Sequence, residues 1–235
     1  MTGKKDCNPA NSPIVFQKII RICARVITFD RDLLLNGMDT LEFIIKRYDI
    51  KLTDDTFLVQ IPYGRWNEMG ALFRDLGFRK GAEIGVHTGR FSKALCVKNP
   101  KLELTGVDSW SVYKDYGDYG TNSTADEAFA EAVARNAKFK IRFIKAFSMD
   151  AVKEFADESL DFVYIDANHN YEYVVADIAA WSKKVRKGGI VCGHDYSDKF
   201  NFGVIGAVNG WCRSYNIKPL FLWQDDRSPS WMYVK

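Results

Sequence analysis

Residues 82–97 read AEIGVHTGRFSKALCV and contain one complete strand-to-helix unit. The apolar run at 82–86 predicts a buried strand, Gly85 and Gly89 predict a tight turn, and residues 90–97 have the apolar spacing of a helix. Short apolar runs and amphipathic segments alternate in the same way to the end of the chain. Such alternation requires a parallel sheet with helices on both faces.

The chain beyond residue 97 supplies the other elements of this sheet. We expect strands at 102–107, 141–144, 160–165, 190–192, 219–223 and 231–234, and helices at 126–137, 149–155, 171–185 and 204–215. The pattern Thr124-x-x-Glu127 is typical of a capping box at the first of these helices. Residues 224–230 are too few for a crossover helix, so the last two strands should pair antiparallel. The predicted fold class is α/β: a doubly wound, mostly parallel, Rossmann-like sheet of about seven strands with an antiparallel end.

The segment before residue 78 has helical patterns without strand–helix alternation. Residues 1–13 are polar and contain two prolines, which indicates a loose arm. Apolar spacing predicts helices at 14–29, 40–48 and 66–76, and Gly77 is a typical helix stop. We therefore divide the chain into an N-terminal arm with a helical cap, residues 1–77, and a main domain, residues 78–235.

Composition and charge narrow the class of protein. Hydrophobic residues make up 47% of the chain and charged residues 27%, which is ordinary for a globular enzyme. No run approaches the ~18 apolar residues of a membrane span, and the N-terminus lacks the pattern of a secretory signal. The net charge of +3 gives no argument for a nucleic-acid or membrane partner. We expect a small-molecule substrate, no nucleic acid and no membrane, while homo-oligomer formation stays open.

The cysteines point to a reducing compartment. They are widely spaced and include no C-x-x-C pair: Cys7, Cys23, Cys96, Cys192 and Cys212. This pattern argues against a disulfide framework or a zinc site and predicts free core thiols. We therefore expect a cytoplasmic protein.

Two acidic motifs follow the first two strands of the main domain. The loop Glu83-x-Gly85-x-x-x-Gly89 is not the G-x-G-x-x-G fingerprint of dinucleotide-binding proteins, and Glu83 suits a cationic amino group better than a pyrophosphate. The plain alternative is a glycine-bearing turn with no ligand. Asp108 ends the second strand, where a carboxylate can accept hydrogen bonds from both hydroxyls of a ribose.

Acids and histidines follow two later strands. Asp166 and His169 lie in the segment 160–172, LDFVYIDANHNYE, and His194 and Asp195 lie in the segment 187–196, KGGIVCGHDY. Carboxyl ends of neighbouring parallel strands meet at one edge, so these four side chains should share one crevice. Oxygen and imidazole donors without thiolates suit Mg²⁺ or Mn²⁺. The plain alternative is a set of helix caps and loop acids.

Together these motifs resemble class I S-adenosylmethionine-dependent methyltransferases, over about residues 78–200. Within that family they are similar to the macrocin- and sugar-type metal-dependent O-methyltransferases, in which an I-D-x-x-H-x-Y segment precedes a G-G-x-x-x-x-H-D or D-D segment. His194 stands where these relatives often carry a second acid. Residues 78–235 would then be the S-adenosylmethionine-binding methyltransferase domain.

The resemblance implies roles for individual residues. S-adenosylmethionine would contact Glu83, Gly85, His87, Thr88, Gly89, Asp108, Ser109, Ser148 and Asp166. Mg²⁺ or Mn²⁺ would be held by Asp166, Asp195 and His194. His169 and Asp166 would be catalytic, with His169 accepting the proton of the acceptor hydroxyl. Ser148 could instead be only a helix N-cap.

The predicted function is a divalent-metal-assisted O-methyltransferase that acts on a hydroxyl of a small molecule or a glycosyl group. The alternatives are a non-catalytic binding module with the same fold, a metal-independent methyltransferase, and a nicotinamide-dependent oxidoreductase, which the glycine spacing disfavours. Residues 110–124 combine Trp110, Tyr113, Tyr116 and Tyr119 with polar residues. We expect a mobile loop that could close as a lid and that favours a sugar over a flat phenol. The plain alternative is a surface loop whose tyrosines pack on the cap helices.

Overall fold

A computed structural model describes residues 37–112, 121–198, 203–224 and 228–235 of the chain. Several features named above lie outside these ranges: the helix at 14–29, Cys7, Cys23, Tyr113, Tyr116 and Tyr119. The proposed lid at 110–124 is therefore described only at its two ends.

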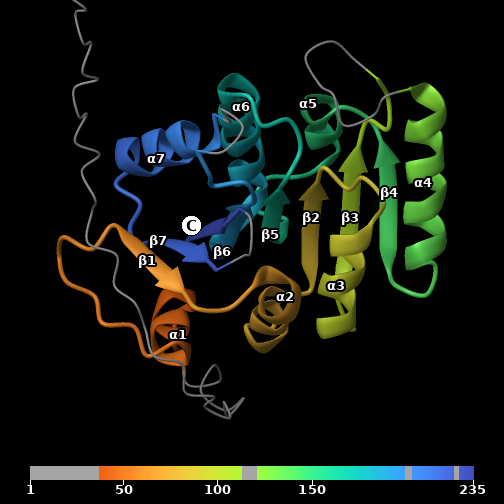
Figure 1. Cartoon of the computed structure of the whole chain (residues 1–235). Helices are drawn as coiled ribbons and strands as arrows, with labels where there is room; N and C mark the ends of the chain where they lie inside the picture. The colour runs from red at the N-terminus through yellow and green to blue at the C-terminus, as the bar shows by residue number, and fades with distance from the viewer. Residues whose placement is uncertain (1–36, 113–120, 199–202, 225–227) are drawn as a thin grey trace, which may run out of the picture.

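One sheet of eight strands organises the described residues (Figure 1). Its strands are β1 (Leu58–Ile61), β2 (Lys80–Ile84), β3 (Glu103–Asp108), β4 (Ile141–Lys145), β5 (Leu160–Ile165), β6 (Val185–Gly193), β7 (Leu220–Trp223) and β8 (Ser230–Val234). They lie in the order β1-β7-β8-β6-β5-β2-β3-β4, and only the pairs that β8 forms with β6 and β7 are antiparallel. The doubly wound α/β sheet and its antiparallel end are confirmed.

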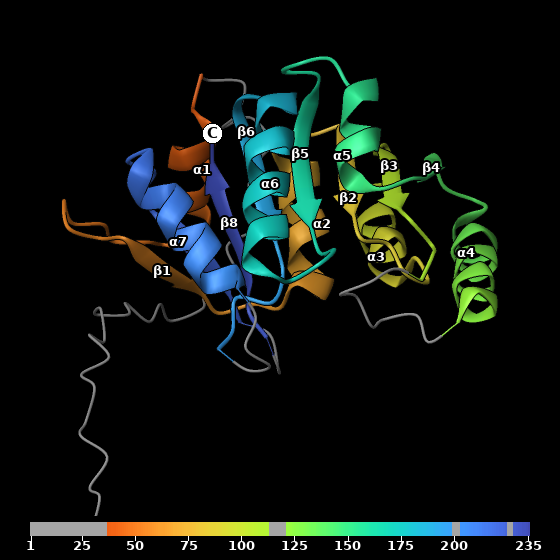
Figure 2. The same ribbon diagram turned by 90° about the horizontal axis from the view of Figure 1, so that it is seen from above.

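Helices cover both faces of this sheet (Figures 1 and 2). They are α1 (Thr40–Arg47), α2 (Arg65–Asp75), α3 (Arg90–Lys98), α4 (Asn122–Asn136), α5 (Ser148–Ala151), α6 (Tyr171–Trp181) and α7 (Val204–Ser214), with short 3₁₀ turns at Val152–Glu154 and Ser182–Lys184. Among these described helices, none combines the length and the apolar composition needed to cross a bilayer.

The alternation of side chains along β5 explains the two layers. Phe162 and Tyr164 are buried with residues of α1, α2 and α3 in one hydrophobic cluster. Val163 and Ile165 are buried with residues of α5, α6 and α7 in a second cluster. Successive side chains of a strand point to opposite faces, so one continuous apolar run builds both halves of the core.

The strand β1 is a finding that the sequence analysis did not predict. Residues 58–61 lie in the segment assigned to the helical cap, yet they pair in parallel with β7, from Leu58 opposite Leu220 to Ile61 opposite Trp223. The strand has only four residues, and a run this short carries little periodicity. The proposed division between residues 77 and 78 stays a prediction.

Helices α4 and α6 have boundaries that differ from the predicted ones. Helix α4 begins at Asn122 because Thr121 and Thr124 form the capping box, in place of the expected Thr124 and Glu127. Helix α6 ends at Trp181, well before the expected residue 185, because Val185 already pairs with Leu160 as the first residue of β6.

Candidate active site

The predicted site residues gather where β2, β3, β5 and β6 end. Asp108 is the last residue of β3, Asp166 follows the last residue of β5, and Asp195 comes two residues after β6. The backbone of His194 donates to the carbonyl of Ile165 at 3.1 Å, which holds the ends of β5 and β6 together. The parallel strands thus bring residues far apart in sequence to one edge.

Gly85 is required by a close approach of two loops. It has a φ of +88°, and a Cβ at this position would lie 2.0 Å from the carbonyl oxygen of Asp166. The backbone of Asp166 also donates to the carbonyl of Ile84 at 2.7 Å. Any other residue at position 85 would separate the glycine loop from the loop after β5.

Asp108 anchors the glycine loop. Its Oδ2 accepts hydrogen bonds from the backbone N–H groups of Val86 and His87, each at 2.9 Å. Its Oδ1 accepts one from the backbone of Trp110 at 2.9 Å. His87 has a φ of +51°, an uncommon conformation for a non-glycine residue that these bonds help to hold. The carboxylate of Asp108 therefore holds the glycine loop in place from the end of β3, where it could also contact a ligand.

Trp110 corrects part of the lid prediction. Its side chain is buried, and its Nε1 donates to the carbonyl of His87 at 2.8 Å. The ring packs against Phe129 and Phe143. Trp110 thus belongs to a small core cluster under the glycine loop, because its indole satisfies a loop carbonyl there. It does not belong to a mobile aromatic loop.

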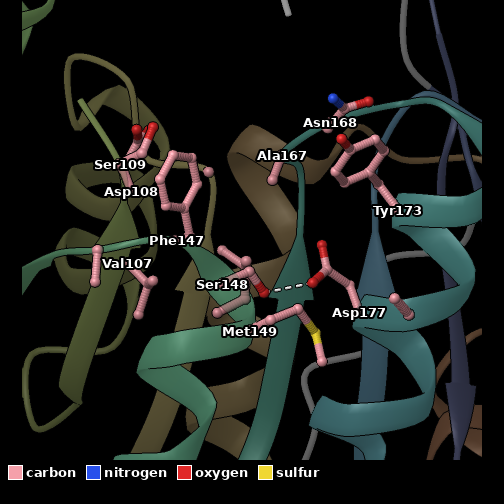
Figure 3. Close-up of a pocket in the computed structure, with 14 residues that line it drawn as sticks. Val107, Asp108, Ser109, Phe147, Ser148, Met149, Ala167, Asn168, Tyr173 and Asp177 are labelled. Carbon is pink, nitrogen blue, oxygen red and sulfur yellow. Dashed lines mark hydrogen bonds between the residues drawn. The ribbon is translucent and has the colours of Figure 1, made fainter. Parts of the chain in front are cut away.

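A cavity of about 380 Å³ opens beside these loops (Figure 3). It is lined by Ile84, Gly85, Val107, Asp108, Ser109, Ala146, Phe147, Ser148, Met149, Ala167, Asn168, Tyr173, Ala176 and Asp177. Four of the predicted cofactor residues therefore lie on its wall: Gly85, Asp108, Ser109 and Ser148. The other five, Glu83, His87, Thr88, Gly89 and Asp166, do not line it, and their contact with a cofactor stays a prediction.

Glu83 lies beneath the glycine loop. Its side chain is buried, and the hydroxyl of Ser92 donates to its carboxyl group. Burial raises the pKa of Glu83 to about 8; the Ser92 bond opposes this shift, and the nearby Asp166 carboxylate adds to it. Glu83 is therefore largely protonated at neutral pH.

Ser148 has a different role from a helix N-cap. Phe147 occupies the N-cap position of α5, and the hydroxyl of Ser148 makes no cap hydrogen bond. It accepts a hydrogen bond from Nε1 of Trp181 at 2.7 Å and donates one to Oδ1 of Asp177. Asp177 was missed by sequence reasoning, although a lone acid in the apolar helix segment 174–181 is a signal that could have found it.

The acids and histidines after β5 and β6 form one cluster. His169 Nε2 lies 2.8 Å from Asp195 Oδ2 and 3.5 Å from Asp166 Oδ1. His194 Nδ1 lies 3.2 Å and 3.7 Å from the same two oxygens. Asp195 has a φ of +54°, so its backbone is also held in an uncommon conformation. The structure thus brings together the four residues that the sequence pattern singled out.

The charges of this cluster depend on one another. Burial disfavours a charged imidazole, but hydrogen bonds and attraction from Asp166 and Asp195 outweigh it and raise the pKa of His169 to about 10. The same contacts, against the effect of burial, hold the pKa of both carboxyls below the usual range. His169 is therefore an imidazolium at neutral pH. It can serve as a base only when another cation neutralises the two carboxylates.

Arg65, the first residue of α2, also belongs to this site. Its Nη1 donates to Asp166 Oδ2 at 3.1 Å and to the hydroxyl of Tyr164. The guanidinium is buried and lies over the rings of Trp66 and Phe91, at 4.9 and 4.8 Å from their centroids. Sequence reasoning missed Arg65 because it is 101 residues from Asp166 and no motif links the two.

The donor set fits a divalent cation. One ligand atom each from Asp166, His169 and Asp195 lie within 4.8 Å of one another. Two carboxylates and an imidazole suit Mn²⁺. This group contains His169 where the sequence prediction names His194 as the third ligand, but both imidazoles reach the same carboxylate oxygens. Arg65 holds Asp166 Oδ2 and leaves Oδ1 facing the cluster.

Residues 82–196, which include the glycine loop, Asp108 and the whole acid–histidine cluster, match the protein family described as "Methyltransferase domain". This part of the chain is thus similar to methyltransferase domains. The region that matches the family ends one residue after Asp195 and does not include Arg65.

Two curated proteins are similar to part of this chain. The uncharacterized protein y4gI of Sinorhizobium fredii is 28% identical over 141 residues, which are 57% of this chain and 14% of that protein. The uncharacterized protein R132 of Acanthamoeba polyphaga mimivirus is 26% identical over 133 residues, which are 54% of this chain and 56% of that protein. The chain thus spans less than two thirds of the length of either relative.

A solved structure shares the fold of this chain. The O-methyltransferase from Bacillus cereus in complex with SAH aligns with a TM-score of 0.54 and 14% identity, over 89% of this chain and 93% of that one. The Rossmann-like methyltransferase fold is thereby confirmed for the chain as described.

Proposed function

We propose that the protein is an S-adenosylmethionine-dependent O-methyltransferase. The observation that carries this proposal is the continuity of the cavity with the acid–histidine cluster. Ala167 and Asn168 line the cavity of about 380 Å³, and the residues on either side of them, Asp166 and His169, belong to the cluster. A cofactor bound in the cavity would place its reactive end beside groups that can bind and deprotonate a hydroxyl.

The residues on the cavity wall can bind the parts of S-adenosylmethionine. Asp108 lies on the cavity wall at the end of β3, where its carboxylate would accept hydrogen bonds from the ribose hydroxyls beside the backbone groups that it already binds. Gly85 allows the ligand to approach the backbone where β2 ends. The fold likeness to a methyltransferase solved with SAH supports this placement.

The acid–histidine cluster would position the acceptor oxygen and remove its proton. We propose that Asp166, Asp195 and His194 hold a divalent cation, Mn²⁺ or Mg²⁺, and that His169 is the proton acceptor. Such a cation lowers the pKa of an oxygen bound to it. Neutralisation of Asp166 and Asp195 would also remove the attraction that keeps His169 protonated, so that its Nε2 could accept the hydroxyl proton.

One observation favours metal-independent transfer as the second candidate. Arg65 is a permanent cation 3.1 Å from Asp166, and His169 is an imidazolium, so two positive groups balance two carboxylates without any metal. In that case Arg65 would supply the charge that keeps Asp166 ionised, and the proton acceptor would be another group.

The acceptor and the cellular setting are further parts of the proposal. We propose a hydroxyl of a glycosyl group or another small molecule as acceptor, because paired carboxylates suit neighbouring oxygens of a sugar. Nucleic acid and membrane are not proposed as partners, and the net charge of +3 gives neither one support. Cys96, Cys192 and Cys212 are free and buried, which supports a place in the cytoplasm.

A methyl-transfer screen with glycosides and catechols side by side tests this function. We expect transfer from labelled S-adenosylmethionine to a glycoside, its loss in EDTA and its recovery with Mn²⁺. Full activity in EDTA would support the metal-independent candidate, and turnover confined to catechols would overturn the sugar acceptor.

Separate measurement of Mn²⁺ affinity by electron paramagnetic resonance distinguishes the two imidazoles. His194→Gln should lose most Mn²⁺ affinity if His194 is the ligand. His169→Gln should then retain Mn²⁺ and lower turnover by about 10²–10⁴-fold. The reverse pattern would assign the ligand role to His169.

A further inference from the structure

A buried carboxylate faces the cavity from the side opposite Asp108. Asp177, on α6, is 4% exposed and lines the cavity. Figure 3 shows one of its oxygens bonded to Ser148 and the other turned toward the space that Ala167 and Tyr173 border. Among the described residues, no group donates a hydrogen bond to this second oxygen. A carboxylate oxygen that faces a cavity can accept a hydrogen bond from a ligand bound there.

The hydrogen bonds of Ser148 show that Asp177 accepts a hydrogen bond from the Ser148 hydroxyl. Ser148 has one hydroxyl proton, and its oxygen already accepts a hydrogen bond from Nε1 of Trp181 at 2.7 Å. It therefore gives its proton to Oδ1 of Asp177. Burial raises the pKa of Asp177 to about 6 while the Ser148 bond opposes the shift, so the group is mainly a carboxylate at pH 7.5. The oxygen in the cavity can then only accept.

The walls between Asp108 and Asp177 suit a flat aromatic base. Ile84, Ala146 and Ala176 give an apolar surface, and the half-exposed ring of Phe147 stands at the rim. With the ribose on Asp108, as in the proposed function, the base would lie in the part of the cavity toward Ser148 on α5 and Asp177 on α6 (Figure 3). An adenine carries an amino group at its 6-position, whereas a 6-oxopurine presents an acceptor there.

We propose that Asp177 determines the base specificity of the cofactor site by accepting a hydrogen bond from the exocyclic amino group of adenine. This inference rests on the proposed function. A 6-oxopurine would set its carbonyl oxygen against the carboxylate, and a purine without the amino group would leave Asp177 unsatisfied. Buried polar groups that lose their partner in this way are a strong source of discrimination.

Calorimetric binding of three ligands tests the proposal: S-adenosylhomocysteine, its 6-oxo analogue S-inosylhomocysteine, and the analogue without the 6-amino group. The wild-type protein should prefer S-adenosylhomocysteine over both analogues by roughly 10- to 150-fold. In Asp177→Asn, Ser148 should still donate to the amide oxygen, so that the amide nitrogen faces the cavity and donates. This variant should lose the preference for adenine or reverse it in favour of the 6-oxo analogue.

Asp150→Asn is the matched control, because Asp150 is an exposed acid on α5 that pairs with Lys153 outside the cavity. It should keep the wild-type preference. Equal affinity of the wild-type protein for all three ligands would overturn the role of Asp177 even if no variant folded. An unchanged preference for adenine in folded Asp177→Asn would overturn it as well. Failure of the wild-type protein to bind any of the three would instead count against the proposed function.

Discussion

Asp108→Ala should lower both stability and cofactor affinity, because one carboxylate serves the glycine loop and the ribose. Three backbone N–H groups, of Val86, His87 and Trp110, lose their acceptor in this variant. Hydrogen bonds to a charged group contribute about 1.5–3 kcal/mol each, and water can replace part of them at this half-buried site. We therefore expect the free energy of unfolding to fall by about 2–4 kcal/mol. Loss of the ribose contact should weaken S-adenosylhomocysteine binding by about 10- to 150-fold.

Asp161→Ala is a closely matched control. Asp161 Oδ2 also accepts two backbone hydrogen bonds, from Arg79 and Lys80 at 2.6 and 2.9 Å, but at the opposite end of β5. Urea denaturation should show comparable losses of stability in both variants, while titration calorimetry should show weaker binding only in Asp108→Ala. Equal losses of affinity in the two variants, or no loss in Asp108→Ala, would refute the ribose assignment.

Two further predictions concern buried charges. Arg65→Met and Arg47→Met remove arginines of similar burial, paired with Asp166 in the first case and with Glu68 and Asp75 in the second. Both variants should lower the free energy of unfolding by about 2–4 kcal/mol. Only Arg65→Met should also lower turnover, by about 10–100-fold, because Arg65 positions Asp166. Equal turnover in the two variants would contradict this positioning role. The pKa of Glu83 is about 8 in the folded protein against 4.5 in the unfolded chain. Its contribution to stability is therefore present below pH 4.5 and is lost as the pH rises through 8. The loss in the free energy of unfolding is about 5 kcal/mol. Glu83→Gln should therefore lose less stability than the wild-type protein between pH 5 and 8.5 in urea titrations, and identical pH profiles would contradict the buried, protonated Glu83.

The sheet and its functional edge can be predicted from the sequence because they follow from local patterns. The apolar run of β5 fills both layers of the core, with Tyr164 on one face and Ile165 on the other. Polar residues directly after such runs must lie at the carboxyl edge of a parallel sheet. Asp108, Asp166 and Asp195 are recognisable for that reason, before any coordinates are known.

The features that the sequence does not reveal depend on long-range packing. Arg65 reaches Asp166 only because α2 lies against the face of β5 that carries Tyr164. Strand β1 gains its hydrogen bonds from β7, near the other end of the chain. Asp177 is recognisable as a site residue only from its hydrogen bond with Ser148, 29 residues away, and from the cavity that both residues line. Neither periodicity nor spacing encodes such contacts.

The most direct test of the central claim is a crystal structure of the protein soaked with S-adenosylhomocysteine and Mn²⁺. We expect the adenosine in the cavity of about 380 Å³, with the ribose hydroxyls on Asp108 and the sulfur toward Asp166. We also expect anomalous density for Mn²⁺ between Asp166 and Asp195. S-adenosylhomocysteine bound away from Asp108, or a cavity that stays empty at saturating ligand, would contradict it.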